Sequence, residues 1–149
     1  MNKRILSTMN KHLIATIIIV TGILASLAAA VPPPSDYDTD RILDAIRQVE
    51  TGGCKDPANA VGDGGKAIGP FQIHQSYWQD AIDYDPSIGG VYADCKSEEY
   101  ARQIVLAYMS RYCKVWTDAN VSRIHNGGPA GHKRKATLGY WSKVQKHLD

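Results

Sequence analysis

Two acidic residues near a glycine-rich turn and an aromatic pair are the residues of this sequence best suited to chemistry. Glu50 precedes Thr51-Gly-Gly-Cys54, and Asp63 lies in a Gly-Asp-Gly-Gly turn. Gly69-Pro-Phe-Gln-Ile73 and then Tyr77-Trp78 follow. Glycoside hydrolysis needs two carboxyl groups on different elements, one to donate a proton and one to attack or stabilise the sugar carbon. A lone acid is usually a solvated surface group, so it is the ordered set that indicates this chemistry.

A helix must position the first of these acids. Thr39 or Asp40 predicts its start, because a capping side chain and an acidic residue both suit a helix N-terminus. Gly52-Gly53 predicts its end, which leaves Glu50 in the last turn. Apolar residues recur at helical spacing and predict a stripe facing the core, made of Ile42, Leu43, Ile46 and Val49.

The segment after this helix predicts a small lobe of turns and strands that carries the second acid. Residues 54–68 are rich in Gly, Asp, Asn and Pro, which indicates turns and a hairpin around Gly62–Gly65. Residues 70–73 are short and apolar, and they predict either a strand or the entry to a helix.

Helical patterns cover most of the remaining chain. Helices are predicted over residues 76–83, 97–112, 120–124 and 137–148. In the last of them we expect four residues to face the core, namely Leu138, Trp141, Val144 and Leu148. The predicted fold class is therefore α+β, mainly α, with a small Gly-rich β-hairpin and loop lobe between helices.

The first thirty residues have the pattern of a secretory signal peptide that is cleaved after Ala30. A basic start precedes an uncharged apolar run over residues 13–27 and then Ala28-Ala-Ala30. An uncleaved anchor is the alternative, because the run approaches the ~18 residues that suggest a membrane span. Cleavage predicts a Pro-rich leader over residues 31–38 and one domain over residues 39–149. It also predicts a secreted protein, or one in a secretory or digestive lumen, without stable membrane association.

Charge is unevenly placed along the chain, although the net charge is only +2. Residues 31–95 hold 11 acidic and 4 basic side chains, whereas residues 96–149 hold 4 acidic and 10 basic ones. The acidic half opposes broad binding of nucleic acid, and no aromatic and basic recognition motif accompanies it. Lys133-Arg134-Lys135 is either a solvated loop or a contact for an anionic polymer such as a bacterial wall.

Three cysteines, Cys54, Cys95 and Cys113, leave at least one thiol unpaired. A helix over residues 96–112 would hold Cys95 and Cys113 ~27 Å apart. The Cα atoms of a disulfide lie ~5.5 Å apart. Any disulfide is therefore expected to contain Cys54, paired with either of the other two. No histidine at ligand spacing accompanies the cysteines, so we expect neither a metal nor another cofactor.

The sequence resembles the invertebrate-type lysozymes, also called the destabilase family. The matching segments occur in the family's order and span nearly all of residues 40–145. Arg123-Ile-His-Asn-Gly-Gly-Pro129 is the most specific, whereas Gly-x-x-Gln-Ile is shared by several lysozyme-like folds. The other segments are Val49-Glu-Thr-Gly-Gly-Cys54, Gly69-Pro-Phe-Gln-Ile73 with Tyr77-Trp78, Tyr108-Met-Ser-Arg-Tyr112 and Thr137-Leu-Gly-Tyr-Trp141.

The resemblance implies a lysozyme-like fold and hydrolysis of the β-1,4 bond between N-acetylmuramic acid and N-acetylglucosamine in bacterial peptidoglycan. It makes Glu50 the proton donor and Asp63 the nucleophile or charge stabiliser. Peptidoglycan is then the expected partner of a monomeric enzyme. The positions that the resemblance assigns to sugar subsites are His74, Gln75, Ser76, Tyr77, Trp78, Gln79, Asp80, Tyr108, His125, Asn126 and Gly127.

Several of these positions also suit a structural role. Trp78 and Tyr108 fall on apolar faces, where aromatic residues usually belong at least partly to the core. His125 equally suits a structural hydrogen-bonding role. The Gln72 amide could bind N-acetyl groups. It could equally form hydrogen bonds with buried backbone groups. Gly127-Gly128 would allow backbone amides to approach a ligand closely.

Departures from the family pattern keep other functions open. The spacing from Glu50 to Asp63 is about one residue longer than usual, which makes Asp56 a fallback second carboxylate. His74 stands where some relatives have a lysine linked to isopeptidase activity. One alternative is a single-glutamate enzyme that resembles lytic transglycosylases or goose-type lysozymes. Others are a non-catalytic peptidoglycan-binding or inhibitor-binding protein and a source of membrane-active cationic peptides.

Overall fold

The computed structural model describes residues 31–148, in which helices and a small sheet form an α+β fold. The helices are α2 (Thr39–Thr51), α3 (Gln75–Tyr84), α4 (Glu98–Tyr112), α5 (Asp118–Gly127) and α6 (Leu138–Val144). The strands are β1 (Val61–Gly62), β2 (Ala67–Ile68) and β3 (Ile73–His74). The predicted fold class is confirmed. Single 3₁₀ turns span Pro57–Asn59, Asp63–Gly65, Pro86–Ile88, Tyr92–Lys96, Gly131–Lys133, Lys135–Thr137 and Gln145–His147.

The predicted signal peptide, residues 1–30, lies outside the described residues, and the domain boundaries stay a prediction. In residues 31–148, no helix combines the length and the apolar character that a membrane span requires. The Pro-rich leader packs on the domain at its first residue. The backbone N–H of Val31 donates to the Ser110 carbonyl at 3.2 Å, and Trp116 Nε1 donates to the Val31 carbonyl at 2.9 Å.

Helix α2 begins and ends close to the predicted residues. The Asp38 side chain caps it by accepting a hydrogen bond from the Arg41 N–H, so the cap lies one residue before the expected position. Gly52 ends the helix, and its N–H donates to the Gln48 carbonyl. Gly53 then adopts a φ of 81°, which glycine tolerates best. Glu50 therefore lies in the last turn, as predicted.

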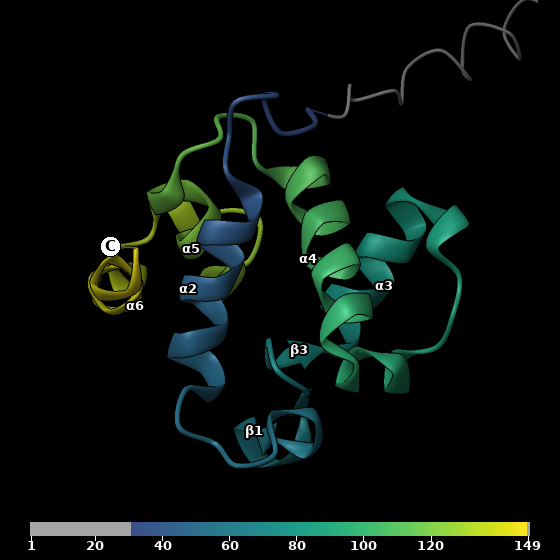
Figure 1. Ribbon diagram of the computed structural model, residues 1–149. Helices are drawn as coiled ribbons and strands as arrows, with labels where there is room; N and C mark the ends of the chain where they lie inside the picture. Colours follow the sequence, from purple (N-terminus) through teal and green to yellow (C-terminus); the bar gives the residue numbers. More distant parts are fainter. Residues whose placement is uncertain (1–30, 149) are drawn as a thin grey trace, which may run out of the picture. The chain divides into compact units, whose positions relative to one another are not determined.

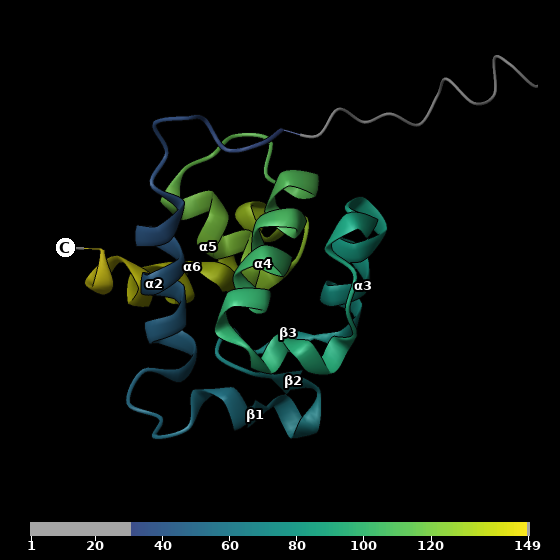
Figure 2. The same cartoon turned by 45° about the vertical axis from the view of Figure 1, so that its right-hand side comes forward.

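The glycine-rich lobe is a three-stranded antiparallel sheet with the order β1-β2-β3. Val61 pairs with Ile68, and Ile68 pairs in turn with Ile73. The predicted hairpin is confirmed, and residues 70–73 lead into a third strand that runs directly into α3. Both ribbon views show this sheet at one end of the molecule, with α4 standing between α2 and α3 (Figures 1 and 2).

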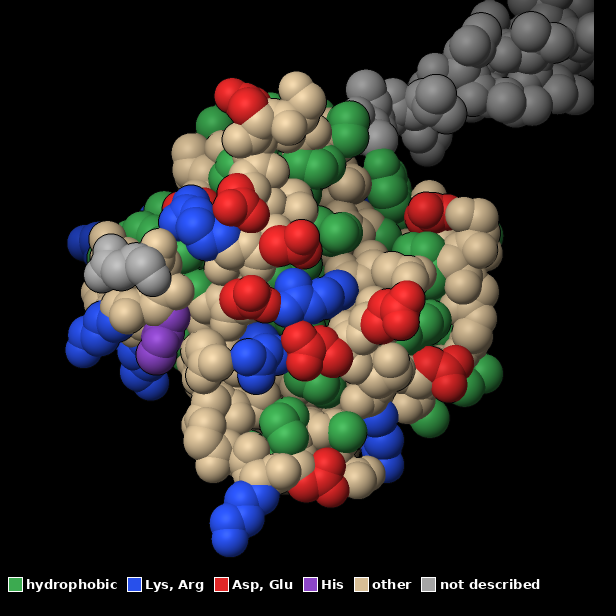
Figure 3. Space-filling model, viewed as in Figure 1, with side chains coloured by type: hydrophobic (Ala, Val, Ile, Leu, Met, Phe, Trp, Pro, Cys, Tyr) green, Lys and Arg blue, Asp and Glu red, His purple; other side chains and the backbone are tan. Residues whose placement is uncertain are grey.

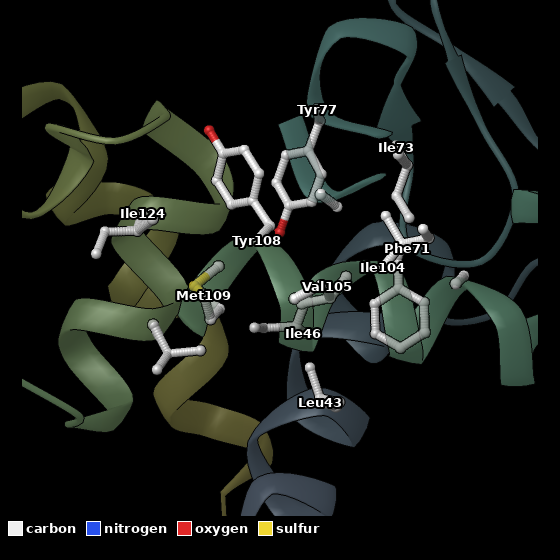
Figure 4. Close-up of a cluster of buried hydrophobic side chains, with 14 of the residues drawn as sticks. Leu43, Ile46, Phe71, Ile73, Tyr77, Ile104, Val105, Tyr108, Met109 and Ile124 are labelled. Atoms are coloured by element: carbon white, nitrogen blue, oxygen red, sulfur yellow. The ribbon is translucent and has the colours of Figure 1, made fainter. Parts of the chain in front are cut away.

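The core lies between α2, α4 and α5 and extends to the start of α3 (Figure 4). Three of the four predicted α2 core residues are fully buried, and Val49 is partly buried against them. Phe71 is completely buried, so the Gly-Pro-Phe-Gln-Ile segment anchors the sheet to the helices. The largest fully buried side chains are Phe71, Ile42, Leu43, Ile46, Ile73, Ile104, Met109 and Ile124.

The C-terminal helices differ from the prediction at their ends. Helix α5 is longer than residues 120–124, because the Thr117 side chain caps it and Asp118 occupies its first turn. Leu138 was predicted to face the core but is 47% exposed. Thr137 is buried in its place, and its hydroxyl bonds the Gly131 carbonyl at 2.8 Å. Val144 is buried as predicted.

In residues 31–148 all three cysteines are free thiols, so a disulfide between Cys54 and either of the other two is not confirmed. Cys54 is exposed in the turn after α2, whereas Cys95 and Cys113 are buried at the two ends of α4. Burial raises the pKa of Cys95 to about 12 and that of Cys113 to about 11, so both stay protonated near neutral pH. Cys113 Sγ also donates to the Val115 carbonyl at 3.3 Å. Packing holds these segments without a cross-link.

Ion pairs join the outer faces of α2 and α4. Arg102 of α4 contacts Glu98 on its own helix and both Asp40 and Asp44 on α2. Arg47 of α2 has its Nε 3.4 Å from Glu98 Oε1. The space-filling view shows acidic and basic side chains alternating over this face (Figure 3). The network is mainly structural, because each charge in it already has an opposite partner.

Candidate active site

Glu50 lies in the last turn of α2 with its side chain 19% exposed. Its Oε1 accepts a hydrogen bond from the Tyr140 hydroxyl at 2.7 Å. His125 Nε2 lies 3.6 Å from the same oxygen. Residues from α5 and α6 thus surround this carboxyl group, which leaves only a small part of it open to solvent.

Asp63 lies in the turn between β1 and β2 with its side chain 68% exposed. Its Oδ2 is 3.3 Å from His74 Nε2, at the end of β3. Asp63 adopts a φ of 49°, in the left-handed region that non-glycine residues rarely occupy. The sheet register explains the contact with His74, because β2 pairs with both β1 and β3 and so brings the turn beside the last strand.

One cleft of about 270 Å³ contains both acids. Besides them, its lining consists of Ala67, Gln72, His74, His125 and Asn126. Asp63 and Gln72 are the two non-glycine residues with a positive φ in the part of the chain that the structure describes. Strained backbone of this kind tends to occur at functional sites. The two predicted catalytic residues therefore share a site, and so do three of the predicted sugar-binding residues.

His125 has a structural role, which was one of its two expected roles. Its side chain is 4% exposed. Nε2 lies 3.2 Å from the Phe71 carbonyl oxygen, and Nδ1 lies 3.3 Å from the Tyr77 hydroxyl. Burial lowers the pKa of His125, although the charge of Glu50 and the Phe71 carbonyl oppose that effect. A neutral ring fits these partners, with Nε2–H donating to the carbonyl and Nδ1 accepting from the hydroxyl.

Tyr77 and Tyr108, which the resemblance assigns to sugar subsites, are in the core. Tyr77 is 9% exposed and Tyr108 is 3% exposed. Their rings stack on each other with centroids 3.6 Å apart (Figure 4). Both rings are buried because α3 and α4 pack together at this point, which for Tyr108 agrees with the expected core position. Trp78 is partly buried, and its Nε1 donates to the Tyr100 hydroxyl at 2.9 Å.

Gln72 and Gly127 also have structural roles. Gln72 Nε2 donates to the Gly69 carbonyl at 2.9 Å and the Ala60 carbonyl at 3.3 Å, which holds the strained segment in place. A Cβ on Gly127 would lie 2.5 Å from Thr137 Cγ2, so glycine is needed there for packing. The N–H of Gly128 donates to the Ile124 carbonyl and ends α5. Packing therefore explains the glycine at position 127, and helix capping explains the glycine at position 128.

The other predicted subsite residues lie on α3. Gln75 and Ser76 line a second hollow of about 350 Å³ with His74, Lys66 and Tyr92. Gln79 and Asp80 already have partners on or near α3. Gln79 Nε2 donates to Asp83 at 2.8 Å, and Asp80 lies 3.6 Å from Arg111. These two residues do not line the cleft that contains Glu50.

Asp56, the alternative second carboxylate, does not line the cleft that contains Glu50. The Asp56 carboxylate caps the turn Pro57–Asn59 and accepts hydrogen bonds from the backbone and side chain of Asn59. Over residues 31–148, no cluster of three or more His, Cys, Asp and Glu side chains is suited to a metal ion.

Sequence reasoning missed Tyr140 as a site residue. It belongs to the segment Thr137-Leu-Gly-Tyr-Trp141, which was noted only as part of the resemblance. Its hydroxyl bonds an acid 90 positions earlier in the chain. The one signal in the sequence that could have identified Tyr140 was its position in this segment, which is shared with the family.

A mainly helical domain with a small antiparallel sheet and two carboxyl groups in one cleft is the arrangement of a lysozyme-type glycoside hydrolase. The comparisons agree. Residues 39–147 match the family described as Destabilase. The lysozyme of Meretrix lusoria is 33% identical over 114 residues, which cover 72% of this chain and 88% of that protein. The lysozyme of Ostrea edulis is 30% identical and covers 88% and 93% of the two chains.

A solved structure shows the same fold. The crystal structure of Tapes japonica lysozyme superposes with a TM-score of 0.62 at 33% identity, and it covers 71% of this chain and 87% of its own. The chain belongs to the destabilase family of invertebrate-type lysozymes. The predicted family and the predicted enzyme class are confirmed.

Proposed function

We propose that this protein is a secreted muramidase that cleaves the β-1,4 bond between N-acetylmuramic acid and N-acetylglucosamine in bacterial peptidoglycan. Glu50 is the proton donor, and Asp63 is the nucleophile or charge stabiliser. The observation that carries the assignment is that Glu50 and Asp63 line the same cleft, together with Ala67 of β2 and Gln72. Membership of a lysozyme family supports the substrate class.

The two acids have the environments that their roles require. Glu50 is mostly shielded from water, which suits a general acid that gives its proton to the glycosidic oxygen. Asp63 is open to solvent and lies beside His74, which leaves its carboxyl group accessible to the carbon of a bound sugar. As the C–O bond breaks, Asp63 attacks or stabilises the sugar carbon. The Glu50 carboxylate then removes a proton from a water molecule as the water oxygen bonds to the sugar carbon and releases Asp63, which completes hydrolysis and restores both carboxyl groups.

A single-glutamate reaction is the second candidate, because one observation favours it. The Asp63 side chain is 68% exposed, and solvent screens its charge far more than that of Glu50, which is 19% exposed. A screened carboxylate stabilises a cationic transition state less. In this reaction Glu50 acts alone, and the products are anhydro-sugars or the hydrolysis products of a goose-type-like enzyme.

Clearing of purified peptidoglycan by the wild type, Glu50→Gln and Asp63→Asn tests the proposal, with mass spectrometry of the products. Removing a general acid typically costs 10²–10⁴-fold in rate. We expect a loss of that size for Glu50→Gln and a loss of at least about tenfold for Asp63→Asn, with reducing ends released. Full activity of Asp63→Asn, or anhydro-sugar products, would select the single-glutamate reaction. Clearing by Glu50→Gln equal to that of the wild type would refute the catalytic assignment.

A further inference from the structure

We propose that Tyr140 is a positioning residue for Glu50: its hydroxyl holds Oε1 and thereby makes Oε2 the oxygen that carries the catalytic proton. This inference rests on the proposed function, in which Glu50 is the proton donor. It adds a residue that the sequence analysis did not place in the site.

The hydrogen bond from Tyr140 to Glu50 Oε1 is short, at 2.7 Å, and partly buried. Burial raises the pKa of Tyr140 well above its usual value, and the nearby charge of Glu50 adds to the effect. The hydroxyl therefore keeps its proton over the pH range in which a lysozyme works. It remains a donor whether Glu50 is ionised or protonated, because each form of Oε1 offers a lone pair.

His125 does not compete for this role. Its Nε2 is 3.6 Å from Oε1, beyond hydrogen-bonding distance, and the Phe71 carbonyl is closer at 3.2 Å. Its Nδ1 is paired with the Tyr77 hydroxyl. In residues 31–148, Tyr140 is consequently the one residue whose hydrogen bond to the Glu50 carboxyl group is within normal length.

The two oxygens of Glu50 are therefore not equivalent. Oε1 is occupied, whereas none of the described residues hydrogen-bonds Oε2. In a protonated carboxyl group the carbonyl-type oxygen is a better acceptor than the hydroxyl oxygen, so donation by Tyr140 to Oε1 favours the proton of the acid on Oε2. Oε2 then gives that proton to the glycosidic oxygen. The negative charge that appears on the carboxylate is stabilised by the Tyr140 hydroxyl through Oε1.

Helix α6 holds the tyrosine in place. Val144, one turn after Tyr140, is completely buried, and Trp141 packs partly against the core. The Tyr140 ring also lies beside the His125 ring, with centroids 6.4 Å apart. This packing fixes the direction from which the hydroxyl approaches Glu50.

Tyr140→Phe in the full chain tests the inference with a soluble peptidoglycan oligosaccharide as substrate. A hydrogen bond favours the ionised carboxylate, so its loss should move the basic limb of the kcat profile about one pH unit higher. We expect kcat to fall about tenfold and KM to change less than about twofold, because Tyr140 contacts the acid and not the sugar. Tyr37→Phe is the matched control, because the Tyr37 hydroxyl also bonds a carboxylate, Asp118, at 2.9 Å. Tyr37→Phe should leave the pH profile of kcat unchanged.

Incorporation of a fluorinated tyrosine at position 140 separates positioning from folding. Its more acidic hydroxyl is a stronger donor, so the basic limb should move to lower pH while the ring packing is kept. The inference is overturned if the basic limb of the kcat profile is unchanged both in Tyr140→Phe and with the fluorinated tyrosine at position 140. Glu50→Gln, assayed in parallel, identifies the source of such a failure. If Glu50→Gln is inactive, only the positioning role is lost, and if it is active, the proposed function fails as well.

Discussion

Mild acid should destabilise this protein through His125 before most carboxylates titrate. The imidazole is buried against the Phe71 carbonyl, the Tyr77 hydroxyl and the Glu50 carboxyl group. Burial lowers its pKa in the folded protein, whereas in the unfolded chain the pKa returns to about 6.5. Between these two pKa values the unfolded state binds more protons than the folded state. The stability that His125 contributes is therefore complete above pH ~6.5 and is lost as the pH falls towards its folded pKa.

The size of this loss of stability follows from the titration of one buried histidine. The free energy of unfolding falls by at most about 1.4 kcal/mol for each pH unit below the unfolded pKa. Over one pH unit the full slope amounts to about a tenth to a quarter of the stability of a typical domain of 5–15 kcal/mol. The fall continues until the folded pKa is reached, below which His125 is charged in both states.

Urea unfolding at pH 7.5, 6.5 and 5.5 measures this slope. His125→Gln should lower the stability at every pH but remove most of its dependence on pH in this range. His147→Gln is the control, because His147 is exposed and its replacement should leave the slope as in the wild type. Equal slopes for the wild type and His125→Gln would refute the reasoning, and so would a stability that rises as the pH falls.

Two further predictions concern the fold. Gly69→Ala should cost about 3 kcal/mol or more in urea unfolding, because the new Cβ would lie 2.1 Å from the Cys95 carbonyl oxygen at a φ of 74°. Gly53→Ala, with a φ of 81° but open space, should cost only about 1–2 kcal/mol, and equal costs would contradict the packing argument. Reductant should leave Tm unchanged within about 1 °C, because Cys54, Cys95 and Cys113 are free; a clear fall would indicate a disulfide.

The position of Glu50 could be predicted because the signals that fix it are local. Residues 42, 43, 46 and 49 form a helical stripe, and the two glycines that follow stop the helix within two residues of the acid. The hairpin that carries Asp63 is equally local, since glycines at positions 64 and 65 provide the left-handed backbone of its turn. Local chemistry of this kind can be read without knowledge of the tertiary contacts.

The environment of the site could not be predicted in the same way. Tyr77 and Tyr108 belong to motifs that suit a cleft, but whether a ring faces the cleft or the core depends on how α3 packs on α4. The contact between Tyr140 and Glu50 joins segments 90 positions apart, and no periodicity predicts it. At the start of α6, the hydrogen bonds of Thr137 bury a polar residue in place of Leu138.

Glu50 depends on more of the fold than its own helix. Its direct partner comes from α6, and the nearby His125 comes from α5 and is fixed by Phe71 before β3 and by Tyr77 of α3. Helix α6 is the last and the shortest of the described helices, and a short terminal element opens at a lower free energy than the core. Opening of α6 alone would remove the Tyr140 hydrogen bond while α2 stayed folded. Conditions that loosen α6 should therefore reduce catalysis before they unfold the domain.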